Sequence, residues 1–203
     1  MTDNLLVISQ AAKAVVTREV QKPSPDLVVE ALLTEEKSSK KNKQKYNLDR
    51  LIGNWRLCFI TGTKKTRDRA GIVLGAGRYV PNWVKITISY HNETKLEVEQ
   101  ENNFEAGWVE NLVEFGPLKL CVSGPIKLLS GKYILAFDFT RMTVELFGFK
   151  VYSGYIRDGQ ASEENFYQTS FAKQASFFVY FLVTEKFIAA RGKGGGLAIW
   201  GKD

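Results

Sequence analysis

The feature that most restricts the possible folds is a change of hydrophobic period at Gly53. Before this residue, apolar side chains recur at helical spacing; after it, apolar and polar side chains alternate, as from Val84 to Tyr90. Roughly nine or ten short segments of this kind follow, separated by glycine, proline and asparagine turn signals, which is typical of an antiparallel barrel or sandwich. The segment from Ala175 to Val183 is apolar on both faces and predicts a central buried strand.

Two helices are expected before this point. The spacing of apolar residues predicts a first helix over residues 3–20. A second helix is predicted to begin with Ser24 as its N-cap and Pro25 at its first helical position. The run 37–45 is rich in lysine and lacks apolar residues, so we expect a solvated linker there. The predicted organisation is a helical hairpin with a basic linker (residues 1–45), followed by a barrel domain (residues 46–203).

Shorter signals predict turns and loops inside the barrel. Residues 47–52 are predicted to form a capped single turn. Residues 91–94 are predicted to form a turn, and the pairs Gly116–Pro117 and Gly124–Pro125 are predicted to interrupt strands. Residues 157–173 are polar and are predicted to form a long loop or insertion.

The charge of the chain bears on its partners. A formal net charge of +6 favours acidic partners, either anionic lipid headgroups or nucleic acid, unless it reflects only a soluble basic surface. Lys40, Lys41 and Lys43 are the candidates for an electrostatic tether to a membrane, the alternative being a plain linker. No window of about eighteen residues is apolar enough to span a membrane, and no secretory signal precedes the helices. These features predict a cytoplasmic protein that can lie peripherally on a membrane.

Motifs for enzymatic chemistry are weak. The glycines from Gly71 to Gly77 lack the remainder of a P-loop or a dinucleotide-binding fingerprint, and those from Gly192 to Gly196 indicate a turn or bulge. Glu97, Glu99 and Glu101 alternate with apolar residues, which places them on a solvent-facing side. The single histidine, His91, has no nucleophile motif beside it. We therefore expect no catalytic residue, no metal site and no cofactor.

The two cysteines, Cys58 and Cys121, lie inside separate apolar segments. Neither has another cysteine or a histidine nearby, so zinc binding is not indicated. Buried free thiols are the favoured interpretation, and a disulfide is the alternative.

Aromatic residues are dense in the second half of the chain. The segment 133–139 alternates, and Val144 to Phe149 continues the strand pattern. These side chains can fill a core, or they can line an apolar cavity that holds one small ligand. Stacking on single-stranded nucleic acid is a less favoured alternative. The candidates for a cavity lining are Phe137, Phe139, Val179 and Phe181.

Three stretches carry a resemblance to a known family. They are Leu51–Leu57, which contains Gly53 and Trp55, the pair Gly124–Pro125 with the strand Phe137–Phe139, and the terminal run Arg191–Trp200. The chain resembles the plastid lipid-associated proteins, or fibrillins, of plastids and cyanobacteria, and looks like a divergent cyanobacterial member.

The resemblance implies a mainly β fold: an antiparallel lipocalin-like β-barrel with an N-terminal helical pair, α+β overall. In barrels of this kind an arginine after the last main strand packs on the tryptophan that opens the first. The implied clasp at one barrel end therefore consists of Gly53, Trp55 and Arg191.

The resemblance also implies a function. The expected protein associates with thylakoid lipid or lipid globules and binds or shields a hydrophobic ligand, such as an isoprenoid, carotenoid or quinone, without chemistry of its own. Bilin lyases have a similar barrel, so attachment of a chromophore is the enzymatic alternative. A purely structural role on a membrane surface is the third possibility.

Overall fold

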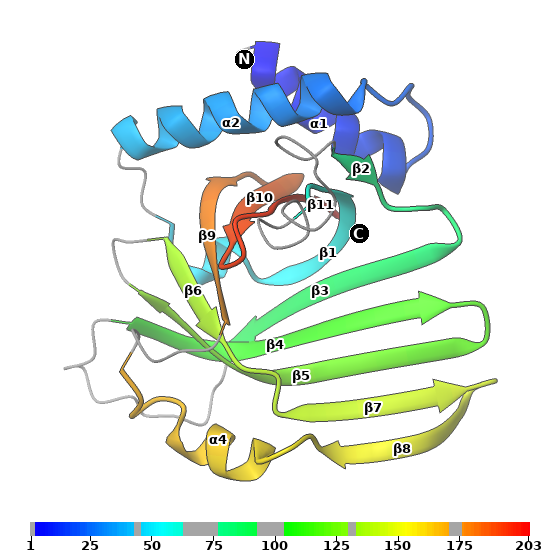
Figure 1. Cartoon of the computed structure of the whole chain (residues 1–203), viewed down its shortest axis with the longest axis vertical. Helices are drawn as coiled ribbons and strands as arrows, with labels where there is room; N and C mark the ends of the chain where they lie inside the picture. The colour runs from blue at the N-terminus through cyan, green and yellow to red at the C-terminus, as the bar shows by residue number, and fades with distance from the viewer. Residues whose placement is uncertain (1–2, 43–45, 63–76, 93–103, 130–132, 171–175) are drawn as a thin grey trace. The chain divides into compact units, whose positions relative to one another are not determined.

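A computed structural model of the chain describes residues 3–42, 46–62, 77–92, 104–129, 133–170 and 176–203. Strands make up 48% of the protein, and the described strands include a closed eight-stranded antiparallel β-barrel. The predicted fold class, a mainly β barrel with an N-terminal helical pair, is therefore confirmed. The chain forms two compact units. The first contains residues 1–44, 55–82 and 178–203, and the second contains residues 45–54 and 83–177 (Figure 1).

The first unit contains the helical pair. Helix α1 (Asp3–Val16) ends four residues earlier than predicted, and Arg18 just beyond it has a left-handed backbone with φ of 61°. Helix α2 (Pro25–Asn42) begins at the predicted proline. Both helices bury their apolar stripes, including Ile8 and Leu32, in one core with the strands of this unit. The helical pair therefore belongs to one compact unit with residues 55–82 and 178–203.

The described strands of the first unit come from its two later segments and include the C-terminal strand of the chain. They are β1 (Gly53–Ile60), β2 (Arg78–Tyr79), β9 (Ser176–Val183), β10 (Phe187–Gly192) and β11 (Leu197–Lys202). Strand β11 pairs antiparallel with β1 on one side and with β10 on the other, and β10 also pairs with β9. The predicted strand over residues 175–183 and the predicted turn at Gly192–Gly196 are confirmed.

The predicted linker after residue 36 was partly wrong. Helix α2 continues through Lys37 to Asn42 because Glu36 faces inward and binds Arg191, while Lys40 lies one turn later and pairs with Glu36 at 3.3 Å. Basic residues in the last turn also suit the negative end of the helix dipole. The remainder of the predicted linker, residues 43–45, lies outside the described residues.

A single 3₁₀ turn, η1 (Leu48–Arg50), opens the second unit at the predicted place. The predicted side-chain cap was wrong: the side chain of Asn47 forms no cap hydrogen bond. Instead, the Leu48 N–H donates to the Glu105 carboxylate at 2.7 Å. Gly53, which follows this turn, has a φ of 124°, a conformation that favours glycine.

The second unit is a twisted antiparallel sheet (Figure 1). Its strands are β3 (Val84–Asn92), β4 (Phe104–Phe115), β5 (Leu118–Leu129), β6 (Ile134–Phe137), β7 (Arg141–Leu146) and β8 (Phe149–Tyr155). The predicted turn at residues 91–94 was wrong at its start, because His91 and Asn92 pair with Trp108 and Gly107 of β4. Residues 93–103, and with them the glutamates of the predicted return strand, lie outside the described residues.

The Gly124–Pro125 pair does not interrupt β5; it marks where β5 changes partners. Residues 118–123 pair with β7, and residues 126–128 pair with β6. At the change, the Pro125 carbonyl accepts a hydrogen bond from the Asp138 N–H, and a side chain at Gly124 would overlap the Asp138 carbonyl. The glycine is therefore required by a close approach of two backbones within a continuous strand.

The predicted loop over residues 157–173 contains a short helix, α4 (Gly159–Asn165), so that prediction was partly wrong. Arg141 of β7 holds the helix through a bidentate pair with Glu163, at 2.6 and 3.0 Å. Beyond the helix, the ammonium of the buried Lys127 donates to the backbone carbonyl of Phe166 at 2.8 Å and to that of Thr169. Burial lowers the pKa of Lys127, and the two carbonyls compensate for part of the hydration that this cation has lost.

Candidate functional site

The cation that lies against Trp55 is not the predicted Arg191. Trp55 is 1% exposed and pairs across β1 and β11 with Lys202, whose ammonium lies 4.3 Å from the centroid of the indole ring. Arg191 pairs with Leu197, at the opposite end of the β10–β11 hairpin. The predicted contact between Arg191 and Trp55 was therefore wrong, because the strand register separates them along the sheet.

Arg191 instead joins the turn between β10 and β11 to helix α2. Its Nε donates to Glu36 Oε1 at 2.8 Å, its Nη2 donates to Glu36 Oε2, and its Nη1 donates to the Gly195 carbonyl. The guanidinium lowers the pKa of Glu36, although burial acts in the opposite direction. The contact is an architectural one, as the sequence indicated, but its partner is a carboxylate.

The four candidates for a cavity lining fall into different surroundings. In the first unit, Phe181 belongs to the core formed with α1 and α2, and Val179 pairs with Arg191. In the second unit, the rings of Phe137 and Phe139 lie 5.2 Å apart. Among the four, Phe139 lines a cavity within the second unit.

The three candidate tether lysines are also separated. Lys40 pairs with Glu36, and Lys41 is exposed near the C-terminal end of α2. Lys43 lies outside the described residues. The structure thus places two of these lysines on a helix, where one already has a carboxylate partner.

Exposed apolar side chains gather at one end of the second unit's sheet, where two hairpins turn. We call this group the apolar rim; its members are Trp83, Phe115, Leu118, Leu146, Phe147 and Phe149. Phe147 and Phe149 are 73% and 76% exposed, and Trp83 is 66% exposed. Single exposed apolar residues need no explanation, but a contiguous group indicates an interaction surface.

Strand register produces the rim. The pairs Val84–Phe115, Phe115–Leu118, Leu118–Leu146 and Leu146–Phe149 form one continuous row across β3, β4, β5, β7 and β8. Trp83 precedes β3, and its ring lies 5.3 Å from that of Phe115 in an edge-to-face arrangement. The row therefore has apolar side chains along the whole end of the sheet.

Two tight turns extend the rim beyond the strands. Gly116 and Pro117 join β4 to β5, and Phe147 and Gly148 join β7 to β8. The Phe147 N–H donates to the Pro117 carbonyl at 3.0 Å, so the two turns are bonded to each other. Phe147 and Gly148 both have positive φ, 51° and 79°, as a type I′ turn requires.

Phe147 is an unusual residue for this turn. Asparagine or aspartate is preferred before the glycine of a type I′ turn, and a bulky side chain with positive φ is strained. The exposed ring gains little from burial in the protein. Backbone strain that is not offset by contacts within the protein is often found at functional positions.

Charged residues occupy the next row of the same sheet. In order across the strands they are Lys85, Glu114, Lys119, Glu145 and Lys150. Lys119 pairs with Glu114 at 3.4 Å. The three lysines outnumber the two glutamates, so this row is weakly positive.

The rim was only partly accessible to sequence reasoning. Gly116–Pro117 was correctly predicted as a break, but Val144 to Phe149 was predicted to be continuous strand. The Phe147–Gly148 turn interrupts that strand, and its apolar residue concealed it, because turn residues are normally polar.

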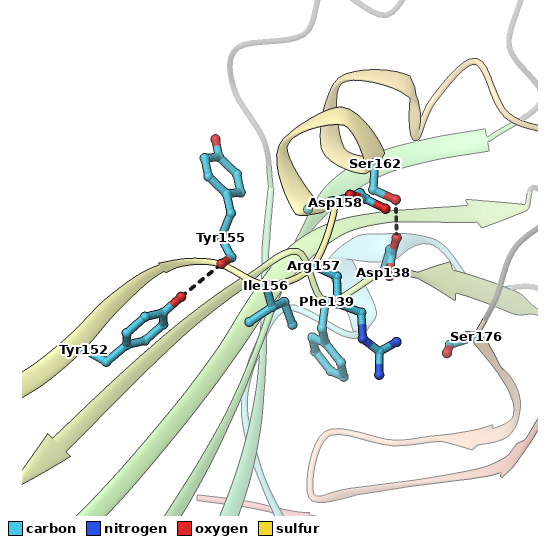
Figure 2. A pocket seen from close by; sticks show the side chains of 10 residues that line it. Asp138, Phe139, Tyr152, Tyr155, Ile156, Arg157, Asp158, Ser162 and Ser176 are labelled. Atoms are coloured by element: carbon cyan, nitrogen blue, oxygen red, sulfur yellow. Dashed lines mark hydrogen bonds between the residues drawn. The ribbon is translucent and has the colours of Figure 1, made fainter.

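A cavity of about 830 Å³ lies in the second unit beside α4 (Figure 2). Its lining residues are Asp138, Phe139, Tyr152, Tyr155, Ile156, Arg157, Asp158, Gly159, Ser162 and Ser176. The Ser162 hydroxyl donates to Asp138 Oδ2 at 2.8 Å, and the Tyr152 hydroxyl donates to the Tyr155 carbonyl at 3.0 Å. In the view of Figure 2, the Arg157 side chain extends in the same direction as that of Phe139, whereas the Asp138 carboxylate points toward Ser162.

Both cysteines are free thiols, as favoured from the sequence, although Cys121 is only half-buried. Within the described ranges, no group of three or more histidine, cysteine, aspartate or glutamate side chains is placed to hold a metal ion. No helix in the described part of the chain has the length and apolar character needed to cross a membrane.

Comparison with protein-family models and with curated proteins finds no match to this chain.

Proposed function

We propose that this protein binds the surface of lipid membranes through the apolar rim. The observation that carries the proposal is the exposed row of aromatic and aliphatic side chains at the end of the second unit's sheet. Tryptophan is favoured where a membrane meets water, because its apolar ring enters the lipid while its N–H group stays hydrated, and phenylalanine and leucine side chains supply the apolar face of proteins that lie at this interface.

The size of the rim is adequate for reversible binding. Complete burial of a large apolar side chain contributes roughly 1.5–3 kcal/mol. If each rim residue gains about 1 kcal/mol on partial entry, the group supplies approximately 6 kcal/mol, equivalent to a dissociation constant of tens of micromolar. Such affinity suits a peripheral protein that exchanges between membrane and solution.

The charged row beside the rim favours an anionic surface. When the rim enters the lipid, Lys85, Lys119 and Lys150 lie one residue away along their strands, at the depth of the headgroups. A lysine near an anionic membrane contributes about 1 kcal/mol, partly offset here by Glu114 and Glu145. We therefore expect stronger binding to anionic than to neutral vesicles, with moderate sensitivity to salt.

The proposal agrees with the function implied by the resemblance to plastid lipid-associated proteins, which includes a thylakoid or lipid-globule surface and no catalysis. The barrel is compatible with ligand binding, so a hydrophobic ligand is a compatible addition. The membrane contact proposed here differs from the tether predicted at Lys40, Lys41 and Lys43, since it uses apolar side chains of the other unit.

A vesicle sedimentation assay tests the proposal. Phe147→Asp combined with Phe149→Asp should reduce binding to phosphatidylcholine–phosphatidylglycerol vesicles by more than about tenfold, since two charges would have to enter the lipid. Leu6→Asp and Leu27→Asp, at exposed apolar positions of α1 and α2, are the matched controls and should bind as wild type.

The main alternative is that a second copy of the chain covers the rim. Strand β8 ends the sheet order, and an exposed edge strand can pair with another edge. A concentration-dependent dimer in light scattering that is lost in the Phe147→Asp, Phe149→Asp variant, together with no vesicle binding by wild type, would replace the membrane proposal with self-association.

A further inference from the structure

The cavity beside α4 has the size of a small-molecule site. Its volume of about 830 Å³ lies within the usual range of such sites, and all its lining residues belong to one compact unit. It borders the C-terminal end of β8, whereas the rim contains the N-terminal end of that strand. The cavity is therefore a feature separate from the proposed membrane contact.

The walls of the cavity are held rigidly. On one side, the Ile156 N–H donates to the Thr140 carbonyl at 2.9 Å, and the Gly159 N–H donates to the Ile156 carbonyl at the same distance. On the other, the ion pair between Arg141 and Glu163 fixes α4 against β7. The polar side chains of the cavity are thus presented by a backbone that is already organised for binding.

Arg157 has a constrained position in this wall. Its φ of 53° is in the left-handed region, which a non-glycine residue rarely occupies. No salt bridge of Arg157 is formed with another residue in the part of the chain that the structure describes. The backbone strain and the available guanidinium together indicate a residue kept for an external ligand.

The charges of the lining define the class of ligand. The charged residues of the described lining are one arginine, Arg157, and two aspartates, Asp138 and Asp158, which gives a net charge of −1. This balance disfavours a phosphate or another strongly anionic ligand. A wholly apolar ligand would dehydrate these three groups without offering hydrogen bonds in return.

A neutral molecule with many hydroxyl groups meets both requirements. Its hydroxyl groups would donate to the carboxylates of Asp138 and Asp158 and accept from the Arg157 guanidinium, in charge-assisted hydrogen bonds. Phe139 also lines the cavity, and the negative π face of a phenyl ring attracts the weakly positive C–H groups of a sugar ring. Ser176 supplies a further hydroxyl at the border of the cavity (Figure 2).

We propose that this cavity binds a pyranose ring of a neutral carbohydrate, with Arg157 and Asp138 as its principal hydrogen-bonding residues and Phe139 as its stacking surface. The ring can belong to a soluble glycoside or to the headgroup of a glycolipid. This inference does not depend on membrane binding by the rim.

Saturation-transfer NMR with methyl glucoside, methyl galactoside and maltose tests the soluble source. Vesicles with and without a monoglycosyl diacylglycerol test the lipid source, with the Phe147→Asp, Phe149→Asp protein used to remove binding by the rim. Binding in either arm supports the proposal, and the arm that responds identifies the source.

Two substitutions localise the binding. Arg157→Gly removes the guanidinium and relieves the positive φ, so it should weaken carbohydrate binding by about tenfold or more without lowering the melting temperature. Asp138→Asn should also weaken binding, while Gln160→Ala on the exposed side of α4 should not. The proposal is overturned if neither arm shows binding, if both cavity variants bind as wild type, or if inorganic phosphate displaces the sugar from the site.

Discussion

Glu36 and Arg191 lie 155 positions apart in the sequence and form a two-pronged ion pair. The carboxylate comes from the inward face of α2, and the guanidinium comes from the end of β10, so the pair joins the helical hairpin to the C-terminal strands of the first unit. Lys40 adds an exposed contact to the same carboxylate.

Loss of this pair should destabilise the protein. Glu36→Ala leaves a partly buried guanidinium without its carboxylate and should lower the free energy of unfolding by about 2 kcal/mol, as judged from other partly buried pairs. Urea denaturation of both single variants and of Glu36→Ala, Arg191→Ala gives the coupling energy. Lys40→Ala, which removes only the exposed contact, should change stability by less than about 0.5 kcal/mol. Strictly additive effects of Glu36→Ala and Arg191→Ala would show that the pair is not coupled.

The Glu36–Arg191 pair should make the free energy of unfolding depend on pH in the acidic range. Arg191 holds the pKa of Glu36 below its ordinary value of 4.5, so the unfolded chain takes up this proton at a higher pH than the folded chain does. The stabilisation is therefore complete above the unfolded pKa and is lost as pH falls through the lowered folded pKa. Urea denaturation above and below pH 4.5 should show that acidification lowers the free energy of unfolding less for Glu36→Gln than for wild type. Equal losses would mean that Glu36 is not the responsible group.

Phe147 should lower the stability of the protein and strengthen its binding to membranes. Phe147→Asn places the preferred residue before Gly148 in the type I′ turn, so the free energy of unfolding should rise by about 0.5–1 kcal/mol. Vesicle binding should fall at the same time, because an exposed apolar ring of the rim is lost. Thermal denaturation and vesicle sedimentation of the same sample measure both effects. A variant that is more stable and binds vesicles as well as wild type would remove Phe147 from the proposed contact.

Cys58 should be chemically inert in the folded protein. Burial raises the pKa of its thiol to about 12, and its Sγ contacts the Ala12 carbonyl beneath α1. Only the thiolate reacts readily with iodoacetamide, so labelling of Cys58 should require unfolding, whereas the half-buried Cys121 should react sooner. Peptide mass spectrometry after timed labelling distinguishes the two. Equal labelling rates under native conditions would contradict the packing of α1 on β1.

The sequence predicted features that depend on neighbouring residues. Alternation identified most strands because each strand buries one face, and Ser24–Pro25 located the start of α2 because capping is a local effect. Gly124–Pro125 was correctly noticed but wrongly interpreted: the close approach of Asp138, which explains the glycine, comes from a different segment.

Features that depend on distant partners were missed. Glu36 of α2 binds Arg191, Glu163 of α4 binds Arg141, and the segment after α4 is held by Lys127, and none of these partners is near in sequence. The cation over Trp55 is Lys202 because of strand register, which composition does not reveal. The apolar rim was missed for a related reason. Several exposed aromatic residues lie in strands, where the same alternation normally indicates a core.

Fluorescence of Trp83 tests the central claim, that the apolar rim enters lipid. Of the four tryptophans, Trp83 is an exposed member of the rim, Trp55 and Trp200 are buried, and Trp108 is half-buried. Vesicles that contain brominated phosphatidylcholine should quench the protein's tryptophan emission, and Trp83→Phe should abolish most of that quenching while vesicle binding is largely retained. No quenching by bound vesicles, or the same quenching in wild type and Trp83→Phe, would contradict the account.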